Sequence, residues 1–170
     1  MKEAHRAEAG GIDRGKASEA TPTSDEEFLI AATRSFLVEV APDEVDIFDA
    51  DPGFYVAGPV TSSAQRDEPL EFGIEVMMLL APFIARGVAA AATLVVDALV
   101  AGAQAETSAT AARWVKRLFR GERVETAAIP ADLPRRVHSV VLQTCRDLGL
   151  PESDSALVSD VVAGRLAEAG

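Results

Sequence analysis

The stretch VMMLLAPFIARGVAAAATLVV, residues 76–96, holds a single charged side chain, Arg86. It lies inside a longer apolar segment, residues 74–105, where Glu75, Arg86 and Asp97 are the only charged residues. A helix as apolar as this one must be covered either by protein or by lipid. The stretch therefore predicts a buried central helix or helix pair of a mainly α-helical bundle, with a membrane-spanning segment as the alternative.

The same segment carries signals for a helix start and for a break. Pro69 is well placed as a first helical residue, because that position needs no backbone donor. Pro82 and Gly87 predict a kink, or a division into two helices, between residues 79 and 87. Glu75, Arg86 and Asp97 are spaced by eleven residues, which is close to three helical turns, so they form one polar stripe. This stripe is either an ion network or the solvent edge of a nearly buried helix.

Hydropathy alone does not separate the protein core from the bilayer. Residues 76–96 have a mean hydropathy of about 2, and about 20 such residues cross a membrane. However, Arg86 near the middle costs at least about 2.5 kcal/mol on insertion. We therefore expect a cytoplasmic protein. The alternative is an inner-membrane protein inserted through residues 74–105, with the basic flank 113–123 in the cytoplasm.

The region before this segment predicts a tail, a helix and a β-hairpin. Residues 1–23 contain few large apolar side chains and predict a disordered tail. Ser24 and Glu27 form a capping box at the start of a helix that ends before Pro42. Residues 44–49 and 54–57 favour strands, and the intervening Asp-Pro-Gly sequence is typical of a turn. A helix and one small β-hairpin are therefore expected over residues 24–68.

Three further helices are predicted after the apolar segment. A basic amphipathic helix spans residues 109–120 and ends at Gly121. Residues 130–169 form a helical hairpin, in which a helix over 133–148 stops at Gly149 and Ser153 caps the last helix. Together with the central segment in 69–121, these elements predict one α-dominated domain over residues 24–170.

The basic helix is the strongest candidate for a binding site. Its cations lie on one face, and two aromatic residues lie on the other, so it can contact an anionic membrane surface or an acidic protein groove. The competing interpretation is internal, because cations in a last helical turn stabilise the helix dipole. The candidate binding residues are Arg113, Trp114, Lys116, Arg117, Phe119 and Arg120.

Composition and motifs argue against nucleic-acid binding, metal binding and catalysis. The net charge of -11 repels phosphate backbones, and aromatic residues make up only 5% of the chain. The acidic run over residues 43–51 lacks a glutamate at position twelve of a calcium loop. His138 and the single Cys145 are about 10 Å apart on one helix, too far for a nucleophile and its base. We expect no metal or cofactor, and a carboxylate-dependent enzyme is the weakest alternative.

Four short stretches resemble a group of bacterial proteins. The sequences EFGIEV (71–76), VKRLFR (115–120), DLGLP (147–151) and VVAGRL (161–166) are similar to those of uncharacterised short helical proteins of high-GC actinobacteria. The resemblance covers about Pro69 to Ala169. It implies an association with multi-gene conflict or defence loci, and it defines no catalytic residue.

Taken together, the patterns predict a non-enzymatic interaction or accessory subunit. The expected partner is another protein or a second copy of the chain. An anionic membrane surface is the alternative partner, and membrane insertion through residues 74–105 is the alternative function.

Overall fold

Helix α4 (Ala81–Ala101) is the centre of the structure. The computed structural model describes residues 24–58, 60, 79–102, 105–122 and 129–169. Within these ranges the secondary structure is helical, and the fold is a mainly α bundle. The predicted tail over residues 1–23 lies outside the described residues.

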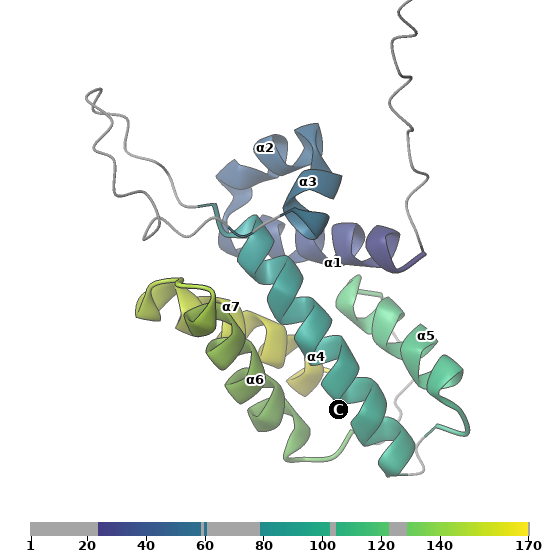
Figure 1. Ribbon diagram of the computed structural model, residues 1–170. Coiled ribbons are helices and arrows are strands. Elements are labelled where there is room, and N and C mark those ends of the chain that lie inside the picture. The colour runs from purple at the N-terminus through teal and green to yellow at the C-terminus, as the bar shows by residue number, and fades with distance from the viewer. Residues whose placement is uncertain (1–23, 59, 61–78, 103–104, 123–128, 170) are drawn as a thin grey trace, which may run out of the picture.

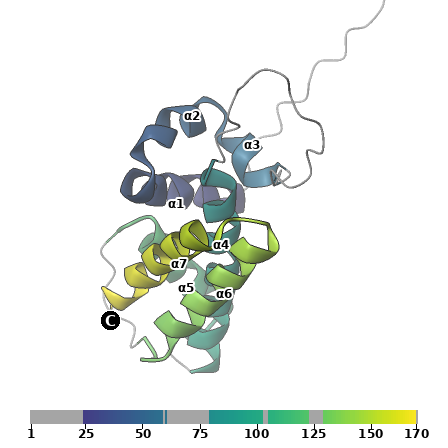
Figure 2. The same cartoon turned by 90° about the vertical axis from the view of Figure 1, so that its left-hand side faces the viewer.

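The helices pack around α4 in two groups. Helices α2 and α3 lie on one side of α1, and α5, α6 and α7 lie on the other side (Figures 1 and 2). Helix α4 contacts α1, α3, α5, α6 and α7. Apart from α4, the described elements are α1 (Ser24–Val40), the short 3-10 helix η1 (Pro42–Glu44), α2 (Val45–Ala50), α3 (Pro52–Ala57), α5 (Ser108–Phe119), α6 (Leu133–Asp147) and α7 (Glu152–Ala167).

The expected β-hairpin over residues 44–57 is wrong, because these residues form η1, α2 and α3. The Asp-Pro-Gly sequence acts as a helix start instead of a hairpin turn. The Asp51 carboxylate accepts a hydrogen bond from the backbone N–H of Phe54 at 3.2 Å, and Pro52 occupies the first turn of α3. Phe48 and Val56 are buried from these two short helices. The apolar residues thus reach the core through helical turns and not through strand alternation.

The predicted division of the central segment into two helices does not occur between Ala81 and Ala101, where α4 is continuous, and residues 69–78 lie outside the described residues. Pro82 lies in the first turn of α4, where its missing N–H leaves no bond unmade. The proline therefore starts the helix, which then runs without interruption to Ala101. Gly87 lies inside this helix at a close contact with α6, since a Cβ atom added there would lie 2.9 Å from Cγ1 of Val141. The close packing against α6 therefore explains the glycine at position 87.

Helices α5, α6 and α7 match the predicted basic helix and C-terminal helical hairpin. Gly121 and Gly149 have positive φ angles of 78° and 86°, and they terminate α5 and α6. After each glycine, a backbone N–H returns to a carbonyl five residues earlier: Leu150 to Cys145 at 3.0 Å, and Glu122 to Arg117 at 3.1 Å. This is the Schellman arrangement, which satisfies the last carbonyls of a helix. Helix α7 starts at Glu152, and no side chain caps it, so the predicted cap by Ser153 is not formed.

A buried carboxylate fixes the start of α4. Glu44, only 7% exposed, accepts hydrogen bonds from the backbone N–H of Leu80 at 2.8 and 3.1 Å, and from that of Ala81 at 3.4 Å. No side chain at the start of α4 accepts a hydrogen bond from its first N–H groups. The Glu44 carboxylate, 36 residues earlier in the chain, takes this N-cap role instead.

Candidate functional site

The basic residues of α5 are partly occupied by contacts within the protein. Lys116 Nζ lies 2.7 Å from the Asp25 carboxylate and 5.9 Å from the ring centroid of Phe28. Arg117 Nε lies 3.0 Å from the Glu122 carboxylate. Arg113 is exposed and donates a long hydrogen bond of 3.4 Å to the hydroxyl of Thr110, one turn earlier in the helix. Arg120, at the end of the helix, is exposed. The cations that the sequence grouped together thus have different roles.

The two aromatic residues of α5 do not form one docking surface. Phe119 is fully buried, and its ring centroid lies 6.1 Å from that of Phe36 in α1. It is a core residue and does not reach a partner in this fold. Trp114 is half-buried and packs against the core. The expectation that Phe119 helps to dock a partner is therefore corrected by its burial.

The polar stripe of the central segment is present in part. Arg86 is half-buried, and its Nη2 donates to the carbonyl oxygen of Gly58 at 3.0 Å. Asp97 is exposed and has no ion-pair partner within the part of the chain that the structure describes. Glu75 lies outside the described residues. Arg86 and Asp97 thus remain as the two charged residues of α4.

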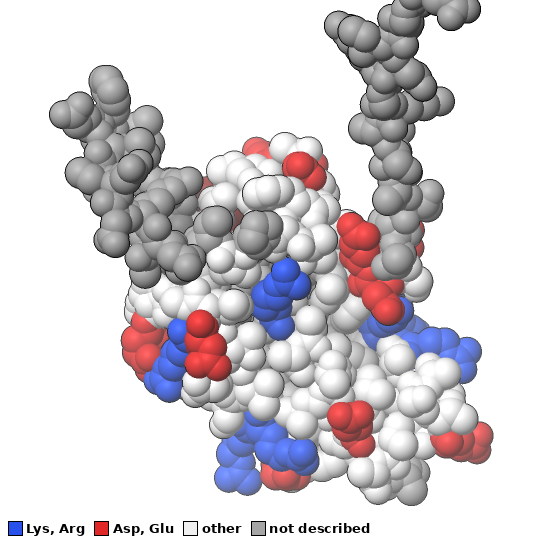
Figure 3. All heavy atoms as spheres, viewed as in Figure 1, with Lys and Arg blue, Asp and Glu red and all other residues white. Residues whose placement is uncertain are grey.

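These two residues belong to an exposed face of α4. Half of the most apolar 18 residues of α4 are buried inside the bundle. The exposed residues of the helix form part of a largely uncharged region of the surface (Figure 3). Residues on the exposed side span about one-third of the helix circumference. We call them the outer face of α4: Arg86, Ala89, Ala90, Thr93, Asp97 and Val100.

The outer face has few polar groups that would need a hydrogen-bond partner in a complex. The Thr93 hydroxyl donates to the Ala89 carbonyl of the same helix at 3.1 Å. Val100 is 41% exposed, although it is a large aliphatic residue. The face therefore combines small or apolar side chains with one cation and one anion, and its apolar part gains free energy if a partner covers it.

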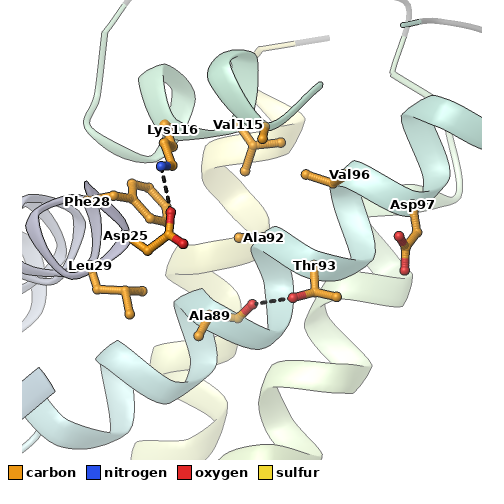
Figure 4. Close-up of a pocket in the computed structure, with 11 residues that line it drawn as sticks. Asp25, Phe28, Leu29, Ala89, Ala92, Thr93, Val96, Asp97, Val115 and Lys116 are labelled. Atoms are coloured by element: carbon orange, nitrogen blue, oxygen red, sulfur yellow. Dashed lines mark hydrogen bonds and ion pairs between the residues drawn. The ribbon is translucent and has the colours of Figure 1, made fainter. Parts of the chain in front are cut away.

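A groove of about 380 Å³ adjoins this face between α1, α4 and α5. Its walls are mostly apolar, and the Lys116–Asp25 ion pair lies at one edge (Figure 4). Asp97 lies at the α4 side and points away from that ion pair (Figure 4). The lining residues are Asp25, Phe28, Leu29, Ala89, Ala92, Thr93, Val96, Asp97, Ala112, Val115 and Lys116.

Sequence reasoning missed this groove because its walls come from distant segments. Asp25 and Lys116 are 91 residues apart and meet only after α1 and α5 pack together. Among the missed residues, Phe28, Leu29 and Val115 carried a signal, as apolar positions of the predicted first helix and of the predicted basic helix. Local periodicity identifies the buried side of each helix, but it does not identify which helices share a groove.

The nucleophilic and basic side chains of α6 do not form catalytic geometry. Burial raises the pKa of the Cys145 thiol to about 11, so the thiol stays protonated at neutral pH. Nε2 of His138 lies 3.1 Å from Oδ1 of Asp160 and 3.4 Å from the Ser159 hydroxyl. In a catalytic triad, the carboxylate contacts one ring nitrogen of the histidine and the hydroxyl contacts the other. Here both Asp160 and Ser159 contact Nε2 of His138, so this arrangement is not formed.

Within the described residues, His, Cys, Asp and Glu form no group of three or more that could hold a metal ion.

Comparisons with protein-family models, with curated proteins and with solved structures find no match for this chain.

Proposed function

We propose that this chain is a non-enzymatic protein-interaction or accessory subunit that binds its partner through the outer face of α4. The observation that carries the proposal is the position of α4, which is both the central helix of the bundle and a helix with one largely uncharged side exposed. A helix that served only the core would be expected to carry mainly polar residues on its exposed side, whereas half of this face consists of alanine and valine: Ala89, Ala90 and Val100.

The chemistry of the face suits a protein partner. Small side chains at Ala89, Ala90 and Thr93 let another helix approach closely, at the interaxial distance of about 8 Å reached by the tightest helix pairs. Arg86 and Asp97 near the two ends can fix the orientation of that helix through ion pairs. The adjoining groove offers room for an apolar side chain beside the helix.

The proposal is tested by measuring the size of the complex that the chain forms in the cells that produce it. A tagged wild-type chain that is chemically cross-linked in intact cells before lysis, so that a weak complex survives dilution, is expected to elute from size-exclusion chromatography as a complex larger than one chain. Thr93→Arg places a charge at the centre of the outer face and is expected to elute as a single chain, because a desolvated unpaired cation is costly. Circular dichroism establishes that the variant retains its helices.

Ser139→Arg is the matched control for this experiment. Ser139 is exposed on α6, and its hydroxyl donates to the Arg135 carbonyl at 3.1 Å, as that of Thr93 does to Ala89. The control is expected to elute with the wild type. The proposal is wrong if the wild type elutes as a single chain, or if Thr93→Arg leaves the complex intact.

A second candidate function is membrane association, favoured by the length and apolar composition of α4. The helix has 21 residues and a mean hydropathy of 1.9 over its most apolar window, so by length and composition it could cross a bilayer. Insertion would require α4 to leave its contacts with α1, α5, α6 and α7. This candidate predicts that the protein pellets with membranes and resists carbonate and high-salt washing, whereas the interaction subunit stays in the supernatant.

The biological setting is proposed from the sequence resemblance alone. Similarity to short helical proteins of high-GC actinobacteria supports an accessory role in a bacterial conflict or defence locus. Identification of the genes that neighbour the coding sequence tests this part of the proposal. Genes for unrelated metabolic enzymes would count against it.

A further inference from the structure

The outer face of α4 carries one positive and one negative charge, Arg86 and Asp97, and their spacing makes the face complementary to a second copy of itself. Arg86 and Asp97 are separated by eleven residues, or about 16 Å along the helix and about 20° around it. They therefore lie at opposite ends of the same exposed strip. Between them lie only small or uncharged positions.

An antiparallel pair of such strips brings opposite charges together twice. When two copies of α4 cross about a two-fold axis that passes between Ala90 and Thr93 of the outer face, Arg86 of each copy faces Asp97 of the other. The same register places Ala90 opposite Thr93, so the centre of the contact contains small side chains. A parallel arrangement in register would instead place like charges opposite each other.

We propose that the outer face of α4 binds the same face of a second copy of this chain, antiparallel about a two-fold axis. This inference rests on the proposed function and names its partner. Two-fold homodimers are the commonest oligomers, and such an interface requires a self-complementary patch. An unrelated partner would need its own charges in this spacing, whereas a second copy provides them.

Both charges are available for pairing across the interface. Arg86 donates to the Gly58 carbonyl through Nη2, and a guanidinium has five N–H donors. Asp97 is exposed and has no ion-pair partner within the described segments. An Arg–Asp pair across helices can form two parallel hydrogen bonds, which adds geometric specificity.

The contact is small, so the dimer is expected to be weak. Helix α4 has 21 residues and is therefore about 31 Å long, and a strip about 10 Å wide covers roughly 300 Å² per copy. A standard interface buries about 800 Å² per partner. The net charge of -11 on each chain also opposes association. Dissociation on dilution through the micromolar range is the expected behaviour.

Sedimentation velocity over a dilution series of the purified full chain tests the proposal with charge exchanges. Wild type is expected to sediment increasingly as a dimer as its concentration rises. Asp97→Arg places two arginines opposite each other, and Arg86→Asp does the same with two aspartates. Each variant alone is expected to associate at least about tenfold more weakly.

An equimolar mixture of the two variants gives the sharpest result. One copy then carries arginine at both positions and the other carries aspartate at both, so two opposite-charge pairs form again, and a one-to-one heterodimer is expected. Glu168→Arg, an exposed site on the turn after α7, is the control for the change in net charge and should dimerise like wild type. Circular dichroism checks each fold, and Thr93→Arg is a second disrupting variant if Arg86→Asp unfolds.

A monomeric wild type at every concentration overturns the inference, as does a dimer that Asp97→Arg leaves unchanged. These failures differ from failure of the proposed function. If the purified chain is monomeric while Thr93→Arg still releases it from a larger native complex, the outer face binds a different protein. If Thr93→Arg changes neither measurement, the proposed function is wrong as well.

Discussion

Replacing Glu44 by alanine removes the side chain that connects η1 to the start of α4. Its carboxylate is the acceptor for the backbone N–H groups of Leu80 and Ala81, with nitrogen–oxygen distances of 2.8 to 3.4 Å. No side chain within the first turn of α4 replaces it. Glu44→Ala therefore leaves two helix-terminal donors without their acceptor.

The expected loss follows from these two hydrogen bonds. A hydrogen bond to a charged group contributes about 1.5 to 3 kcal/mol, and loss of an N-cap costs about 0.5 to 2 kcal/mol. One bond is short and the other is long, so we expect Glu44→Ala to lower the free energy of unfolding by about 2 kcal/mol. Glu44→Gln retains a carbonyl acceptor and should cost about half as much.

The pH dependence separates the carboxylate from a neutral cap. Burial raises the pKa of Glu44 and outweighs the opposite effect of the bonds from Leu80 and Ala81. The folded state therefore holds this proton to a higher pH than the unfolded chain does. As pH rises through the range just above the ordinary glutamate pKa, wild type should lose stability relative to Glu44→Gln.

Urea denaturation followed by circular dichroism at several pH values measures both effects. Asp43→Ala is the control for the loss of stability at a fixed pH, because Asp43 is adjacent and exposed. It is not a control for the pH dependence, because the negative charge of Asp43 itself helps to raise the pKa of Glu44. The reasoning is refuted if Glu44→Ala changes stability by less than about 0.5 kcal/mol, which is the range of ordinary surface substitutions. An opposite pH trend relative to Glu44→Gln would refute the assignment of the raised pKa.

Three further predictions concern the core. Gly87→Val should lower stability by about 1 to 3 kcal/mol in urea denaturation, because its Cβ would lie 2.9 Å from Val141, and Val141→Ala in the same chain should restore part of the loss. Phe119→Ala should cost about 3 to 5 kcal/mol in the same assay, since it removes a fully buried ring packed on α1. The Cys145 thiol, with a pKa of about 11, should react with an alkylating agent at least about a hundredfold more slowly in the folded protein than in denaturant, measured by mass spectrometry.

Most helices were predictable because their ends carry local signals. Gly121 and Gly149 end α5 and α6 with positive φ angles, and the apolar spacing of α6 and α7 identified their buried sides. The error over residues 44–57 has a local cause, since Asp51 and Pro52 are as well suited to a helix N-terminus as to a turn. The sequence Asp-Pro alone does not distinguish a helix start from a hairpin turn. The burial of Phe48 and Val56 decides between them, and it is known only from the folded structure.

The candidate site was predictable only in part, for a similar reason. The sequence identified Arg86 and Asp97 as one stripe of a helix, and the structure places them on its exposed face. The same reasoning grouped Phe119 with Trp114, although Phe119 packs inside the core. Contacts between distant segments, such as that of Lys116 with Asp25, depend on the packing of α1 against α5 and have no local signal.

Protection of the outer face of α4 inside cells tests the central claim most directly. A cysteine introduced by Thr93→Cys is accessible in the isolated chain, whereas the native Cys145 is buried. We predict that a membrane-permeant maleimide labels this cysteine much more slowly in intact cells than in dilute purified protein, while a cysteine introduced by Glu168→Cys is labelled at similar rates in both. An equal ratio of the cellular rate to the purified-protein rate for the two cysteines would contradict the claim that this face is covered by a partner.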